Sequence, residues 1–292
     1  MKRNLFFCIT LILILISGNL SALEIEFGGG GSNLAFDPNR EKSLGDDEKQ
    51  FYSSFSPLGY IFLKDEFTDK IGFNIRYEKD IILRNRLGGI IAVNLNYLKM
   101  EFGPTMSVFN TYEQPLNIGI QGGLQLAYPG IIFGTFKGSS SIGSQNGIPG
   151  DNSQSTAEVN LGFWLPNVIP VLSVSTKSFT KQEDDDLLIQ DQLTRYQFSA
   201  DVFSKNVPFT IRIDMGYESL KRSYKNENSS SDTDELKAIY FGFEGRWRVV
   251  TPLCLIFSLE MPVHSWASQP MKNPDKDLIL YQFFAGASLT FF

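Results

Sequence analysis

Hydrophobic and polar residues alternate along this chain in segments of about ten residues. In one segment every second position from Leu116 to Leu126 is apolar, apart from one glycine, while Gln121 and its neighbours of the same parity are small or polar. The alternation returns at 71–78, 157–163, 209–218 and 239–249. Successive side chains of a β-strand point to opposite faces, so a period of two predicts an all-β protein.

Two architectures fit this pattern, a transmembrane β-barrel and a secreted β-sandwich. The polar face favours the barrel because it is rich in glycine and mixed charge, as a crowded lumen would be. The apolar face ends in Tyr, Trp and Phe near the strand ends, as at a membrane interface. Short turns, typical of the periplasmic side of a barrel, alternate with longer segments, typical of its extracellular side. The turns are 67–69, 128–130, 165–168, 204–206 and 250–252, and the longer segments are 37–56, 144–154, 181–190, 221–235 and 264–277.

The pattern predicts fourteen antiparallel strands and one barrel domain. The strands are expected near 24–36, 57–66, 70–80, 86–95, 97–109, 115–128, 130–143, 155–165, 168–180, 191–203, 207–220, 236–249, 252–263 and 278–292. The segments 57–66 and 86–95 alternate least regularly, which leaves twelve strands as the alternative. Gly28–Gly31 fall in the first strand, where we expect a bend or a β-bulge.

The N-terminus has the form of a secretory signal peptide. Lys2 and Arg3 precede an apolar run at 5–16, and small residues follow up to Ala22. We therefore expect residues 1–22 to be removed and residues 23–292 to form the barrel. The mature chain would keep only Cys254, and so no internal disulfide.

Composition and charge narrow the class further. The chain is 42% hydrophobic and 20% charged, which is too polar for a bundle of membrane helices. Its formal net charge is −6, whereas a surface that binds nucleic acid needs an excess of Lys and Arg. We therefore expect no nucleic-acid partner.

The end of the chain also alternates, from Ile279 to Phe291, and stops at Phe292. This segment resembles the aromatic-ended terminal strand that the bacterial barrel-assembly machinery recognises. The resemblance implies that machinery and outer-membrane lipid as partners. It also implies a location in the outer membrane of a diderm bacterium. The oligomeric state stays open.

Three short stretches resemble uncharacterised outer-membrane barrels of spirochaetes such as treponemes. They are Glu101–Pro104, Tyr128–Gly130 and Ser139–Gly143, within about 45 residues. That resemblance implies the barrel fold and no specific mechanism. The count of fourteen strands resembles the fatty-acid transporters of the outer membrane, but we expect none of their N-terminal hatch here.

No catalytic or metal-binding constellation is expected. The chain has one histidine, His264, and the adjacent Ser265 would point to the opposite face of a strand, so the two cannot form a nucleophile–base pair. The acidic run 183–186 lacks the spacing of a calcium loop and is expected to be a solvated loop. We therefore expect a protein that is not an enzyme and holds no cofactor.

The charged residues of the polar parity are the candidate functional residues. Inside a barrel they would form either bracing ion pairs or a selectivity ring. The candidates that line the pore are Lys177, Asp201, Arg212, Asp214, Glu218, Glu244, Arg246 and Arg248, and the candidate loop contacts are Tyr112, Tyr224 and Trp266. If the strands flanking the 221–235 segment pair symmetrically, Arg212 lies opposite Glu244 and near Asp201.

Three functions are compatible with these features. The leading hypothesis is a passive, porin-like channel for small hydrophilic solutes. The second is a carrier of small apolar ligands, similar to fatty-acid transporters, for which the aromatic residues Phe109, Phe133 and Tyr240 would face the lumen. The third is a surface adhesin or interaction protein that acts through its extracellular loops.

Overall fold

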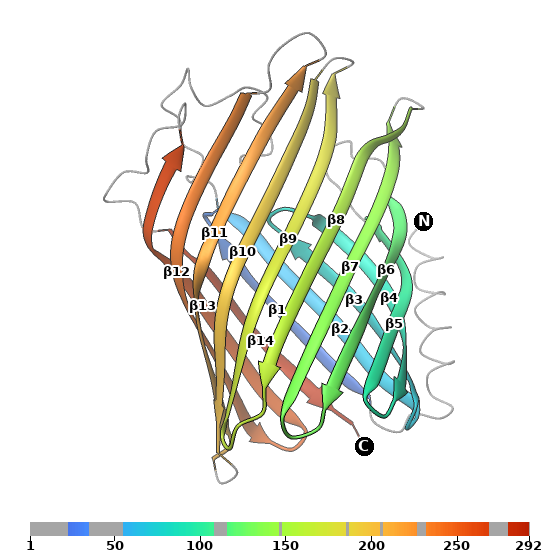
Figure 1. The fold of residues 1–292 in the computed structure, drawn as a ribbon, viewed down its shortest axis with the longest axis vertical. Helices are drawn as coiled ribbons and strands as arrows, with labels where there is room; N and C mark the ends of the chain where they lie inside the picture. The colour runs from blue at the N-terminus through green and yellow to red at the C-terminus, as the bar shows by residue number, and fades with distance from the viewer. Residues whose placement is uncertain are drawn as a thin grey trace.

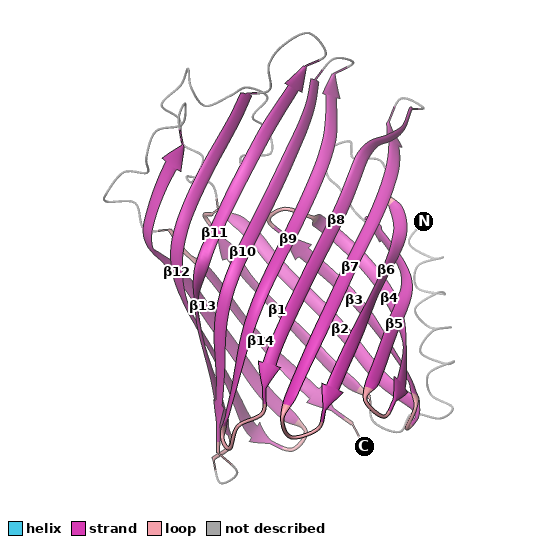
Figure 2. Cartoon of the chain, in the orientation of Figure 1, coloured by secondary structure: helices cyan, strands magenta, loops and turns pink. Residues whose placement is uncertain are grey.

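The chain folds into a closed antiparallel β-barrel (Figure 1). The structure is a computed structural model and describes residues 23–34, 55–107, 116–145, 148–184, 187–204, 207–226, 232–268 and 280–291. The strands are β1 (Glu24–Ser32), β2 (Ser56–Thr68), β3 (Ile71–Asp80), β4 (Arg84–Leu95), β5 (Leu98–Ser107), β6 (Ile118–Tyr128), β7 (Ile132–Gln145), β8 (Ile148–Phe163), β9 (Val168–Asp184), β10 (Leu187–Phe203), β11 (Phe209–Asn226), β12 (Asp232–Val250), β13 (Leu253–Ser268) and β14 (Gln282–Thr290). The described residues contain strands and turns only (Figure 2). No helix among them is long and apolar enough to cross a membrane.

Each strand pairs with its neighbours in sequence, and β1 pairs with β14 to close the barrel. The two described ends therefore meet, and the amide of Phe291 donates to the carbonyl of Leu23 at 2.8 Å. We call this the terminal end and the opposite rim the loop end. The fourteen-strand prediction is confirmed, and the alternative of twelve is wrong because the irregular segments 57–66 and 86–95 lie in the fully paired strands β2 and β4.

The outward face of the barrel is apolar and uncovered. Ile120 is 75% exposed, Phe102 61% and Met215 56%, and many other large apolar side chains of the outward parity are likewise exposed. In a sandwich these rows would pack against one another in a dry core. The alternative of a sandwich is therefore wrong, and a barrel with this outer face requires a hydrocarbon environment.

Aromatic rings lie near both edges of the apolar band. Toward the loop end, Tyr217 contacts Tyr196 and Trp266, with ring centroids 6.2 and 6.1 Å apart, and Trp266 contacts His264 at 5.4 Å. At the terminal end, Tyr97 stacks on Tyr128 at 6.1 Å. Such belts are typical of membrane–water interfaces, where an amphipathic ring contacts both media.

The strands toward the loop end are longer than predicted. The predicted long segments 144–154, 181–190, 221–235 and 264–277 are partly or mostly strand, because β7 to β13 continue into them. Figure 1 shows β8 to β12 rising above the shorter strands β1 to β5. Their outer faces become polar there, and Glu235 accepts hydrogen bonds from Ser219 at 2.7 Å and Ser268 at 3.0 Å. Strands can remain paired through their backbones in water, where they need no apolar face. The end of the hydrophobic alternation therefore indicates the edge of the membrane and not the end of the strand.

The glycine run 28–31 does not form a bulge. The register of β1 is unbroken against both β14 and β2, so that part of the expectation is wrong. A Cβ at Gly30 would lie 1.8 Å from the carbonyl oxygen of Phe283, so glycine is needed there for close approach of two backbones. The run therefore serves the seam at which the barrel closes.

Candidate functional site in the barrel lumen

The inward parity encloses a chamber of about 520 Å³ in the lumen. Its lining comes mainly from β6 to β10 and is rich in hydroxyl and amide groups. These residues are Gln125, Thr135, Asn160, Ser173, Ser175, Gln197, Ser199 and Gln282. Phe133 also lines the chamber, as predicted for an inward aromatic residue, and stacks obliquely against Trp164 with centroids 4.8 Å apart.

Three of the predicted charges line this chamber, and each is paired. Arg212 of β11 holds Asp201 of β10 through two hydrogen bonds, Nε to Oδ1 at 2.6 Å and Nη2 to Oδ2 at 3.0 Å. Lys177 of β9 forms an ion pair with Asp80 at the end of β3. The predicted register is present, with Arg212 opposite both Glu244 and Asp201.

The other predicted charges fall into two groups. Glu244 accepts a hydrogen bond from Arg246 at 2.7 Å, and Arg246 also reaches Glu26 of β1 at 3.3 Å. Arg246 and Arg248 line a second cavity of about 580 Å³ at the terminal end. Asp214 lies deeper in the barrel and accepts a hydrogen bond from Gln197 at 2.8 Å.

Glu218, also predicted, belongs to a cluster around Arg195 that the sequence analysis did not single out. The Arg195 guanidinium of β10 donates to Glu218 of β11 at 2.7 Å and to Glu260 of β13 at 3.1 Å. It reaches that far because it lies over the ring of Tyr240 of β12, 4.5 Å from the centroid. Gly216 makes room for this ring, since a Cβ there would meet the Tyr240 hydroxyl at 2.8 Å. The parity of β10 and β13 would have placed Arg195 and Glu260 in the lumen.

The predicted loop contacts have different outcomes. Tyr224 is in β11 rather than in a loop and is only 7% exposed, so it is not a surface contact. Trp266 is in β13 and belongs to the outer aromatic belt. Tyr112 and Phe109 lie outside the described residues.

The structure also places most of the residues that were considered for catalysis and metal binding. His264 pairs in register with the outward Ile239, while Ser265 has the opposite parity. Asp191, which follows the acidic run in the sequence, forms a buried ion pair with Arg222, with Nε to Oδ1 at 2.6 Å. The side chains of the acidic run itself, 183–186, lie outside the described part of the chain. Among the described residues, no group of three or more His, Cys, Asp or Glu is arranged to hold a metal ion.

No family model matches this chain, and no curated protein matches it. Solved structures with a similar fold include outer-membrane proteins. An outer-membrane channel from Pseudomonas putida F1 has a TM-score of 0.50 at 8% identity, covering 93% of this chain and 96% of that one. An anion-selective porin from Comamonas acidovorans has a TM-score of 0.41 at 6% identity, covering 93% and 99%. OmpT of Vibrio cholerae in its trimer form has a TM-score of 0.39 at 8% identity, covering 93% and 99%.

The chain therefore has the fold of an outer-membrane β-barrel. This fold and the uncovered apolar band together are those of a barrel that spans a membrane with its strands. In such barrels the short turns face the periplasm and the long loops face the exterior. The terminal end is accordingly the periplasmic end, and the loop end is the extracellular end.

Proposed function

We propose that this protein is an outer-membrane channel for small hydrophilic solutes. The observation that carries the proposal is the chamber of about 520 Å³, which is lined mainly by polar side chains and lies inside a barrel with an apolar outer face. A hydrophilic solute crossing a membrane needs a path on which its hydrogen bonds to water are replaced. The hydroxyl and amide side chains that line the chamber would supply these hydrogen bonds.

The pairing of the lumen charges bears on the class of solute. Arg212 binds Asp201, Lys177 binds Asp80, and Arg195 binds two carboxylates. Charges that neutralise one another brace the wall and leave a weak net field in the chamber. We therefore propose that uncharged hydrophilic solutes pass more readily than ions of either sign.

Two neighbouring residues of β9 provide the test. Ser175 lines the chamber, whereas Val174 has the opposite parity and is exposed on the outer face. We expect Ser175→Trp to reduce the uptake of a small uncharged sugar by proteoliposomes several-fold, because the indole would fill part of the chamber. Val174→Trp should leave uptake unchanged, because its indole would face lipid. Equal uptake by the two variants and the parent, with all three folded, would contradict the proposal.

The alternative of a carrier for apolar ligands needs an apolar pocket. The chamber has apolar residues such as Phe133 and Val171 in its lining, but polar and charged side chains outnumber them, and most of the buried apolar cluster packs together outside the chamber. Tyr240, expected as part of such a pocket, is covered by Arg195 instead. Lipid that co-purifies in stoichiometric amount would reverse this preference.

Further parts of the proposal concern assembly and origin. We propose that the protein is exported with cleavage after Ala22 and that the assembly machinery binds β14 through the segment ending at Phe292, which lies outside the described residues. The resemblance to spirochaete barrels and the adhesin function remain predictions. Mass spectrometry of the mature N-terminus would test the cleavage site.

A further inference from the structure

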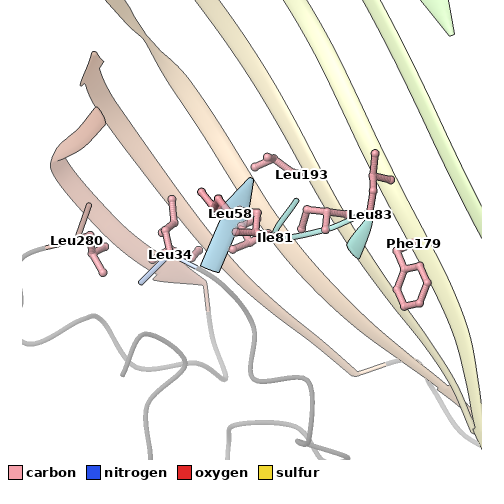
Figure 3. Close-up of a cluster of buried hydrophobic side chains, with 10 residues drawn as sticks. Leu34, Leu58, Ile81, Leu83, Phe179, Leu193 and Leu280 are labelled. Carbon is pink, nitrogen blue, oxygen red and sulfur yellow. The ribbon is translucent and has the colours of Figure 1, made fainter. Parts of the chain in front are cut away.

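An apolar layer crosses the lumen on the extracellular side of the chamber. On the wall, Leu193, Leu220, Leu236 and Ala267 lie directly opposite one another in register on the four adjacent strands β10 to β13. Leu34, Leu58, Phe179, Leu280 and the turn at 81–83 complete the cluster. Figure 3 shows the labelled side chains in a row from Leu280 and Leu34, past Leu58 and Ile81, to Leu83 and Phe179.

The centre of this layer is the turn between β3 and β4, residues Ile81, Ile82 and Leu83. Although it connects two strands at the extracellular end, Ile82 is 1% exposed and Leu83 is 0% exposed. Asp80 shapes the turn, since its Oδ1 accepts hydrogen bonds from the amides of Ile82 at 2.7 Å and Leu83 at 3.1 Å. Three consecutive apolar residues are thereby turned into the barrel and away from water.

The turn is held by contacts that cross the lumen. Asp80 forms its ion pair with Lys177 of β9, and the Leu83 carbonyl accepts a hydrogen bond from Gln154 of β8 at 2.9 Å. In the strand order β8 lies four strands from β4, and β9 lies six strands from β3. These are therefore bridges between distant parts of the wall rather than contacts within a hairpin.

Hydrogen bonds also join β4, β7 and β8 at this level. Arg86 of β4 donates to Ser139 of β7 at 2.8 Å, and the Ser139 hydroxyl is 2.7 Å from that of Thr156 of β8. Thr156 is the register partner of Lys177, which is the partner of Leu193. The hydrogen-bonded side chains and the apolar layer are therefore adjacent on the wall around the turn.

We propose that the turn 81–83 is the gate of this channel, and that the structure holds the gate closed. The inference rests on the proposed function. A layer of buried Leu and Ile side chains excludes water, and an ion or hydrophilic solute cannot cross it without losing its hydration. Passage requires the turn to leave the lumen, which breaks the Lys177–Asp80 ion pair and separates the turn from Leu193. The chamber below the layer then connects to the exterior.

The ion pair is the element to test, because it joins the turn to the distant strand β9 and each partner has an uncharged replacement of similar shape. Lys177→Met keeps the length of the side chain and removes its charge. Asp80→Asn keeps an oxygen that can accept the two amide hydrogen bonds of the turn. We expect each variant to raise the open fraction in planar bilayers about two- to tenfold, with no further rise in the double variant. The triple variant Ile81→Ser, Ile82→Ser, Leu83→Ser should stay open.

Lys99→Met is the matched control. Lys99 also forms an ion pair, with Glu101 at 2.6 Å, but it lies beside the β4–β5 turn at the periplasmic end. We expect its open fraction to equal that of the parent. A folded parent that conducts as steadily as the triple variant would overturn the gate and leave the channel standing.

A second measurement reads the gate without conductance. In a Cys254→Ser background, Leu83→Cys places a thiol in the layer, and a water-soluble thiol reagent reports how often that position meets water. Adding Lys177→Met should accelerate labelling at least twofold, whereas adding Lys99→Met should not. If Lys177→Met accelerates labelling but no variant conducts, the proposed channel function is refuted, whereas the proposed movement of the turn is supported. Equal labelling with and without Lys177→Met would overturn the gate.

Discussion

Arg195 shows how one residue organises the wall of the barrel. Its guanidinium joins β10 to Glu218 of β11 and Glu260 of β13 while lying over Tyr240 of β12. Four strands are therefore tied by one side chain, which can donate to two carboxylates because the guanidinium is planar and carries several donors. The cluster has the geometry of a structural brace, one of the two roles expected for mixed charges in the lumen.

Removal of this brace should destabilise the barrel. Arg195→Met would leave Glu218 buried without its cation, and we expect a loss of about 3 kcal/mol in the free energy of unfolding. The double variant with Glu218→Gln should recover part of the loss, because a neutral amide is easier to bury. Urea titration followed by tryptophan fluorescence in lipid measures both. Equal stability of Arg195→Met and the parent would contradict the bracing role.

At the scale of the element, two adjacent glycines of β1, Gly29 and Gly30, differ in the space around them. Gly30 lies between β1 and β14, where a Cβ would overlap a backbone carbonyl, whereas a Cβ at the adjacent Gly29 would have no neighbour closer than 3.8 Å. A Cβ at each of the two positions points to the opposite face of the strand, so the two methyl groups would meet different neighbours.

This difference gives a matched pair of variants. Gly30→Ala should weaken the β1–β14 seam by more than about 1 kcal/mol, because a backbone shift is needed to admit the methyl group. Gly29→Ala should be tolerated. The fraction that resists unfolding in cold detergent on an electrophoretic gel measures seam closure. A Gly30→Ala barrel as resistant as the Gly29→Ala barrel would remove the close-approach explanation.

At the scale of the whole molecule, closure leaves no free sheet edge and sorts the side chains between two media. The outer band meets hydrocarbon and is bounded by the belts at Tyr217 and Tyr97, while the lumen holds the polar groups and the apolar layer. The long strands β8 to β13 carry the wall beyond the outer belt into water. The inside is thus partly polar and partly dry, which separates a chamber from its exit.

The two faces should respond differently to the same new charge. Phe241 is 49% exposed on the outer face, and Phe241→Arg should cost about 2–4 kcal/mol near the middle of the bilayer. Gln125 lines the chamber, so Gln125→Arg should cost less because its charge would meet polar groups and water. Unfolding titrations of both variants in the same lipid give the comparison. Equal losses of stability in the two variants would contradict the assignment of hydrocarbon to the outer face and water to the lumen.

The sequence by itself determined the local properties of this fold. Alternation reported which face each residue takes, the turn positions separated the strands, and the parity of Arg212 and Asp201 placed both in the lumen. These inferences succeed because the period of a strand is fixed by the backbone and needs no knowledge of distant partners. They failed where a strand continues beyond the membrane into water, and so Tyr224 was predicted in a loop although it is in β11.

Only the tertiary structure decided which parts of the lumen face one another. The run Ile81–Leu83 has no distinguishing pattern in the sequence, and its ties to Lys177 and Gln154 join segments about 70 to 100 residues apart, a separation that local patterns do not encode. Closure of fourteen strands, with a fixed register at each pair, brings those segments together across the barrel. The apolar layer and the Lys177–Asp80 ion pair depend on this closure, because the number and tilt of the strands set the width of the lumen that the turn fills. No local period in the sequence encodes that width.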